Sequence, residues 1–212
     1  MTALVSDKFT RTVATGWGTA VTGGAWTVSS GPNTNVDAGF GNLVVPKGGT
    51  TTANLASVSA PGADLVGTFK VDKASGGSGL YVSSYVRRTS AGVYAAKLKI
   101  PASGPLTLAL TRTPAGGAEV ILQAETTVPG LSYAVGDTLN LRVQAVGTAP
   151  TLLNAKVWKV GTQEPSTWLR SVLDTTSGMQ SNGSVGLAAY LSSSATLTPV
   201  TVKLDELTVT AP

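Results

Sequence analysis

Four short segments of the chain carry tyrosine, tryptophan, arginine, lysine and glutamine at alternate positions, where such side chains could bind a ligand together. The segments are 80–88, 93–100, 139–146 and 152–158. Apolar residues occupy the intervening positions, so a β-strand would send the two sets to opposite sides. If these strands share a sheet, their polar sides form one ligand-binding face. Its predicted members are Tyr81, Tyr85, Arg87, Lys97, Arg142, Gln144, Lys156 and Trp158.

These residue types are suited to sugar recognition. Flat aromatic rings stack on the apolar faces of pyranoses, and forked amide and guanidinium donors hydrogen-bond to hydroxyl groups. Tyrosine, tryptophan and arginine also dominate the energetics of protein interfaces, and aromatic residues favour strands for packing reasons alone. The pattern is therefore consistent with a glycan site, a protein interface or a solvated outer face, and the residues leave these three interpretations open.

The sequence lacks the residues of common catalytic centres. It contains no histidine and no cysteine, so neither a Ser-His-Asp triad nor a thiolate nucleophile can be assembled. A retaining glycosidase needs two carboxyl groups about 5–5.5 Å apart, and nothing in the sequence marks Glu119 and Glu125 as such a pair. The glycine-rich stretch 75–79 lacks the lysine of a phosphate-binding loop. We therefore expect a protein that is not an enzyme.

Alternation of apolar and polar residues continues along the whole chain and predicts the elements that position these side chains. Further examples are 106–112 and 200–209, and clusters of glycine, proline and asparagine separate the runs. Segment 164–173 is a helix candidate, but a short turn at Pro165 is favoured. We predict an all-β, two-sheet antiparallel jelly-roll sandwich that occupies residues 1–212 as a single domain. Tryptophans in irregular segments are expected to plug the ends of its core: Trp17, Trp26 and Trp168.

Composition argues against several classes of partner. The 15 Lys and Arg residues against 11 Asp and Glu give a net charge of +4, and Arg87 and Arg88 form the only adjacent basic pair, so we expect no nucleic-acid partner. No stretch approaches the roughly 18 apolar residues that cross a bilayer, so we expect no membrane partner. The first residues lack the charged and apolar regions of a signal peptide, which predicts a chain that does not use the general secretory route.

Several segments resemble a known module. They are Asp7–Arg11, Gly16–Gly18, Lys156–Gly161, Val185–Ser192 and Val200–Leu207. Together they are similar to the concanavalin A-like lectin/glucanase (laminin G-like) jelly-roll module of actinobacterial secreted proteins and of minor tail proteins of actinobacteriophages. The resemblance covers nearly the whole chain. It implies the same sandwich, but because this fold hosts lectins, hydrolases and structural proteins, it says little about activity.

The resemblance adds two expectations about sites. Glycosidases of this superfamily carry E-x-D-x-x-E along one strand, and none of the four glutamates of this chain opens such a motif. Related jelly rolls often hold a structural calcium ion where the first and last strands meet, and Asp7, Asp205 and Glu206 lie near those strands. A structural calcium is therefore the one cofactor we consider. The alternative is a surface ion-pair cluster with Lys8 or Lys203.

The resemblance and the missing signal peptide together suggest a role. We expect a non-catalytic virion protein of an actinobacterial phage, either a minor tail, fibre-associated or capsid decoration subunit. Its expected partners are other virion proteins, surface polysaccharide or both, and packing in several copies within the assembly would fit this role. The alternative is an extracellular carbohydrate-binding module of a secreted bacterial protein. A hydrolase with an unrecognised site is the third option.

Overall fold

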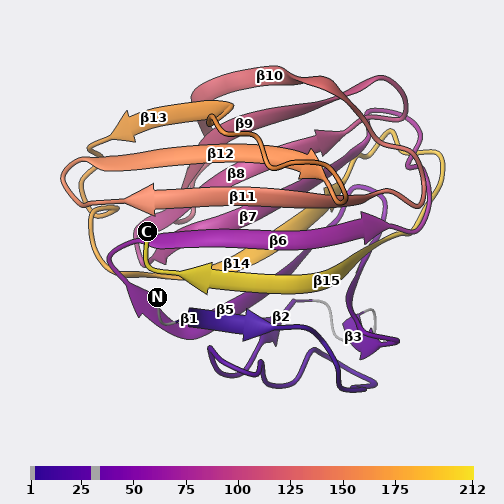
Figure 1. The fold of residues 1–212 in the computed structure, drawn as a ribbon, viewed down its shortest axis with the longest axis horizontal. Helices are drawn as coiled ribbons and strands as arrows, with labels where there is room; N and C mark the ends of the chain where they lie inside the picture. The colour runs from indigo at the N-terminus through magenta and orange to yellow at the C-terminus, as the bar shows by residue number, and fades with distance from the viewer. Residues whose placement is uncertain (1–2, 30–33) are drawn as a thin grey trace.

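The alternating segments form strands that pair into two antiparallel sheets facing each other (Figure 1). The computed structural model describes residues 3–29 and 34–212. The eight-stranded sheet comprises β1 (Ala3–Asp7), β3 (Thr34–Asp37), β4 (Phe40–Val45), β6 (Ala63–Val71), β11 (Thr138–Val146), β12 (Thr151–Lys159), β13 (Arg170–Asp174) and β15 (Val200–Thr210). The seven-stranded sheet comprises β2 (Thr27–Val28), β5 (Thr50–Ala60), β7 (Leu80–Thr89), β8 (Gly92–Ile100), β9 (Pro105–Pro114), β10 (Val120–Ser132) and β14 (Gly183–Leu191).

The order of strands decides which elements become neighbours. The eight-stranded sheet runs β13-β12-β11-β6-β15-β4-β3, with β1 also paired to β15, and the seven-stranded sheet runs β10-β9-β8-β7-β14-β5-β2. The chain ends therefore lie side by side, since Ala3 pairs with Thr210 (Figure 1). At the other side of the sandwich, β10 is the edge strand of one sheet, and β13 and β12 form the edge of the other.

The sequence-based prediction of an antiparallel β-sandwich is confirmed. Strand β11 shows why the pattern works: Leu139, Leu141, Val143 and Ala145 are fully buried, and the residues between them are half-buried. Each fully buried leucine or valine side chain contributes about 1.5–3 kcal/mol through removal from water. Residues 164–169 of the helix candidate lie in an irregular loop, 160–169, in agreement with the favoured turn. The remaining residues of the candidate, 170–173, belong to the short strand β13, which was not predicted.

An aromatic cluster fills one end of the core. The rings of Phe9 and Trp17 lie 5.1 Å apart in an edge-to-face arrangement, and those of Trp17 and Trp26 lie 5.0 Å apart. Gly41 of β4 provides the space, because a Cβ atom there would lie 2.6 Å from a ring carbon of Phe9. The expectation that Trp17 and Trp26 are core residues is confirmed. In the described part of the chain, no helix has the length and hydrophobicity needed to cross a membrane.

Candidate functional site

A groove of about 540 Å³ lies beside the outer half of β12. It exists because the short β13 covers only part of its neighbour: the β12–β13 pairing ends at Ala155 and Arg170. Beyond that point the edge of β12 faces residues 128–131 of β10, from the other sheet, and the loop 160–169 closes the third side. We call this the β12 groove. Its lining residues are Val128, Pro129, Gly130, Leu131, Lys156, Val157, Trp158, Lys159, Thr162, Gln163, Pro165, Thr167, Trp168 and Leu169.

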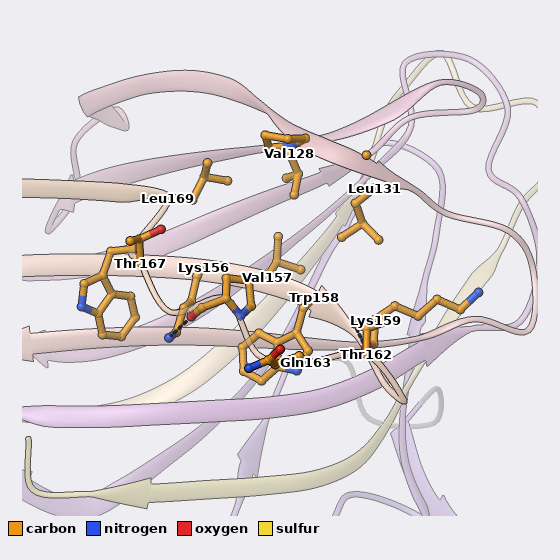
Figure 2. Close-up of a pocket in the computed structure, with 14 residues that line it drawn as sticks. Val128, Leu131, Lys156, Val157, Trp158, Lys159, Thr162, Gln163, Thr167 and Leu169 are labelled. Carbon is orange, nitrogen blue, oxygen red and sulfur yellow. Dashed lines mark hydrogen bonds between the residues drawn. The ribbon is translucent and has the colours of Figure 1, made fainter.

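The groove has an apolar floor and an aromatic outer lip. Val128 and Leu131 project from β10 toward Val157, whereas Trp158 projects to the opposite side of β12 (Figure 2). Strand alternation explains this split, because consecutive residues of a strand point to opposite faces of the sheet. Trp158 is half-buried and lies opposite Asn140 in the ladder with β11. A ligand in the groove would therefore meet aliphatic side chains below and an indole ring at the rim.

The second indole, that of Trp168, is held in place by two cations. The ammonium of Lys156 lies 4.7 Å from the centre of the Trp168 ring, and the guanidinium carbon of Arg142 lies 5.4 Å from it. Cations at this range are attracted to the ring by its quadrupole. Trp168 is half-buried, so the ring is fixed by the protein and still partly open to solvent. The expectation that Trp168 plugs the core is therefore wrong: the loop carries it to the outer surface of the sheet.

These cations belong to a chain of ion pairs on the outer surface of the eight-stranded sheet. Arg142 donates to Asp64 from Nε at 2.9 Å and from Nη2 at 2.7 Å, and to Glu164 from Nη1 at 2.6 Å. Lys156 lies 2.7 Å from the same Glu164 carboxylate and donates to the carbonyl oxygen of Pro165 at 2.7 Å. Burial opposes ionisation of Glu164, but the hydrogen bonds from Lys156 and Arg142 outweigh it and lower its pKa. The network therefore anchors the loop 160–169 to the sheet.

Polar groups complete the rim of the groove. Thr162, Gln163 and Thr167 contribute hydroxyl and amide groups, and Lys159 forms an ion pair with Asp137. The edge of β12 adds main-chain groups. The Ala155 carbonyl accepts a hydrogen bond from the Leu169 amide at 3.0 Å. Val157 lies two residues further along the strand, so its backbone polar atoms point the same way. No strand pairs with β12 on that side beyond Ala155 within residues 3–29 and 34–212. The groove thus combines two aromatic rings with neutral hydrogen-bonding groups.

The structure divides the predicted ligand-binding face between the two sheets. Strands β7 and β8 belong to the seven-stranded sheet, and β11 and β12 to the eight-stranded sheet, so the condition that the four strands share a sheet is not met. Arg142, Gln144, Lys156 and Trp158 are brought together on one sheet, whereas Tyr81, Tyr85 and Lys97 lie on the other.

The residues on the seven-stranded sheet form a smaller aromatic patch. The rings of Tyr81 and Tyr190 lie 5.9 Å apart, and the ammonium of Lys97 lies 5.1 Å from the Tyr81 ring. Lys97 also pairs with Glu119 at 2.6 Å. Tyr85 is more deeply placed, and burial raises the pKa of its hydroxyl. A ligand role for these residues remains a prediction that is independent of the β12 groove.

Arg87 is not on any outer face, which corrects the sequence-based prediction. A bulge in β7 between Tyr85 and Arg87 inserts one extra residue, and this reverses the side to which the following residues point. The Arg87 side chain is fully buried and donates to Thr151 Oγ1 and to the carbonyl oxygens of Pro61 and Gly147. Burial lowers its pKa. Arg87 ties together two loops at one end of the sandwich and is not available to a ligand.

The predicted calcium ligands do not converge. Asp7 pairs with Leu207 in the β1–β15 ladder and is fully buried, so its carboxylate points into the protein, whereas Asp205 is exposed. Glu206 faces Lys8 at 3.7 Å. The Asp7 carboxylate accepts hydrogen bonds from Arg11 at 2.7 and 2.8 Å, from Trp26 Nε1 at 2.7 Å and from the Phe9 amide at 3.1 Å.

Internal donors therefore occupy the place that a cation would take at Asp7, and the calcium prediction is wrong for this residue. In the described ranges, no cluster of three acidic residues is arranged to hold a metal ion. The ion-pair alternative holds in part, because Lys8 does pair with Glu206.

Sequence reasoning missed most of the groove. Only Lys156 and Trp158 of its lining were predicted as site residues; the contributions of β10 and of the loop 160–169 were not. One signal was present, since Gln163, Pro165 and Trp168 follow closely after the strand that carries Trp158. Residues 128–131 gave no such signal, because their approach to β12 depends on the packing of one sheet against the other.

Comparison with known proteins identifies the fold. No protein-family model matches the sequence, and no curated protein matches it either. Solved structures do match. A legume lectin-like domain from Entamoeba histolytica superposes with a TM-score of 0.59 at 8% identity, over 88% of this chain and 90% of the other. The protein has the concanavalin A-like lectin/glucanase fold.

Two enzymes share this concanavalin A-like sandwich. A β-1,3-glucanase from Mycobacterium marinum has a TM-score of 0.58 at 15% identity, over 99% of both chains. An endo-acting O-glycanase from the human gut microbiota has a TM-score of 0.63 at 12% identity, also over 99% of both chains. Since lectins and hydrolases both adopt the fold, activity must be argued from the side chains of this chain.

Proposed function

We propose that this protein is a non-catalytic carbohydrate-binding protein and that the β12 groove is its glycan site. The observation that carries the proposal is the presence of Trp158 and Trp168 on one groove, together with neutral amide, hydroxyl and main-chain groups. Indole rings stack on pyranose faces, and the polar groups hydrogen-bond to sugar hydroxyls. The likeness of the fold to a lectin domain adds support.

The state of the glutamates supports the absence of catalysis. Each of the four is engaged with a lysine or arginine: Glu119 with Lys97, Glu125 with Lys99, Glu164 with Arg142 and Lys156, and Glu206 with Lys8. A general acid of a glycosidase needs a raised pKa, whereas the pKa of Glu164, the glutamate next to the groove, is lowered. The chain also contains no histidine to act as a base.

The test is retention of the protein in affinity gels that contain polysaccharides, preceded by a glycan array to choose them. We expect W158A and W168A each to weaken retention by about tenfold or more, because truncating a central aromatic contact typically costs at least about 2 kcal/mol. Tyr190→Ala is the matched control, since Tyr190 is also a partly exposed aromatic residue but lies on the other sheet. Circular dichroism checks that each variant keeps its β-sheet content.

Two results would contradict the proposal. The first is an array and gel series in which the intact protein binds no polysaccharide. The second is retention that falls in Y190A and not in the tryptophan variants, which would move the site to the Tyr81–Tyr190 patch of the seven-stranded sheet.

Carbohydrate binding is the part of the sequence-based expectation that the structural neighbours favour. The virion role has no counterpart among the neighbours named above. It stays a prediction from the sequence resemblance, and immunogold labelling of purified particles is its test.

A further inference from the structure

The charges around the β12 groove are balanced within the protein. The ion pairs join Lys156 and Arg142 to Glu164, Arg142 to Asp64, and Lys159 to Asp137. Three cations thus meet three carboxylates. Arg170, which follows the lining residue Leu169 and has no carboxylate partner among the described residues, donates to the carbonyl oxygen of Ala124 and is not part of the lining. Among the described residues that line the groove, a ligand therefore finds no unpaired cation.

Glu164 is the residue that completes this balance. It follows Gln163 and precedes Pro165, both of which line the groove, and its side chain is 38% exposed. The Lys156 side chain is only 8% exposed, and its ammonium is shared among the Glu164 carboxylate, the Pro165 carbonyl and the Trp168 ring. The lowered pKa of Glu164 keeps it ionised at neutral pH. Without Glu164, Arg142 would remain paired with Asp64, and Lys156 would lack a carboxylate.

We propose that the β12 groove selects uncharged polysaccharides and that Glu164 is the residue that determines this specificity. The inference rests on the proposed function and names its ligand class. A uronic or sialic acid placed against Trp168 would find Lys156 and Arg142 already paired with Glu164, so its carboxylate would leave water without a free cation to meet it. A charged group that loses its water without gaining an opposite charge binds more weakly than a neutral one. Hydroxyl groups of a neutral chain meet no such penalty and can bond to Gln163, Thr162 and the β12 edge.

The experiment compares neutral and acidic polysaccharides in affinity gels, with β-glucan and mannan against alginate and hyaluronan. The intact protein should be retained by at least one neutral polymer and at least about tenfold less by the acidic ones. In Glu164→Gln, the ratio of acidic to neutral retention should rise about tenfold, and salt at about 0.5 M should abolish the gain, because it screens the exposed charge. Glu119→Gln is the matched control, since Glu119 also pairs with a lysine but on the other sheet.

A double variant guards against an indirect effect of the substitution. Adding Lys156→Gln to Glu164→Gln restores the charge balance and should return the ratio of acidic to neutral retention to that of the intact protein. The specificity inference is overturned if the intact protein retains acidic and neutral polymers equally, or if E164Q gains no acidic retention while circular dichroism shows it folded. If the intact protein is retained by no polysaccharide at all, the result is a different one, because it overturns the proposed function itself.

Discussion

Replacement of Asp7 by asparagine tests the structural role assigned to this carboxylate. Asp7 is fully buried. Its carboxylate accepts hydrogen bonds from both terminal nitrogens of Arg11, from Trp26 Nε1 and from the Phe9 amide. Asparagine keeps the shape and loses the charge. It also places an NH₂ group where an acceptor oxygen is needed, so at least one buried donor loses its partner.

The magnitude follows from the burial of the pair. Removing one partner of a buried ion pair costs about 3–5 kcal/mol. The Arg11 side chain is 23% exposed, so water can take over part of its hydrogen bonding and the lower end of the range applies. We expect D7N to be about 3 kcal/mol less stable, which for a domain of this size lowers the melting temperature by roughly 6–12 °C.

Urea unfolding followed by tryptophan fluorescence measures the effect, because Trp26 bonds directly to Asp7 and packs on Trp17. Asp205→Asn, at an exposed position near the same two strands, is the control and should change stability by no more than about 0.5 kcal/mol. Neither calcium nor a chelator should shift the melting temperature of the intact protein. Equal stability of D7N and the intact protein, or a melting temperature that rises with calcium, would refute this account of Asp7.

Two further predictions concern Arg87 and the hydrogen-bonded pair Tyr94 and Asp174. Arg87→Met should lower the free energy of unfolding by about 2 kcal/mol, because the buried Thr151 hydroxyl and the partly buried carbonyls of Pro61 and Gly147 lose a charged donor. Relief of the buried charge offsets part of this cost. Unchanged urea stability would contradict the prediction. Asp174 accepts from the Tyr94 hydroxyl at 2.6 Å and from the Thr176 amide at 2.8 Å. Burial opposes its ionisation, but these bonds outweigh burial and lower its pKa below the usual 3.8. A lowered carboxyl pKa stabilises the fold above the unfolded pKa, and this stability is lost as pH falls through the native value. Tyr94→Phe should therefore lose less stability than the intact protein as pH falls below about 4; parallel pH profiles would argue against this contribution.

Much of the fold could be predicted because its signals are local. Alternation along 139–146 fixes which side chains enter the core whatever strand lies beside them, and glycine-rich turns divide one strand from the next. The absence of histidine and cysteine limits the available chemistry whatever fold the chain adopts. Such statements depend only on residue type and spacing.

The composition of the site depends on contacts that have no local signature. Period-two alternation says which residues share a side of one strand and nothing about which sheet the strand joins, so Tyr81 and Trp158 were expected on one face and lie on different sheets. The bulge that turns Arg87 inward adds one residue to β7 without breaking the apolar pattern. The early end of β13, which leaves the edge of β12 open, and the approach of residues 128–131 from the other sheet follow from sheet-on-sheet packing. The sequence by itself determined an antiparallel sandwich with few groups suited to catalysis. Only the tertiary structure decided that Trp158 and Trp168 line one groove, because the neighbours of these two residues are set by pairing between distant segments.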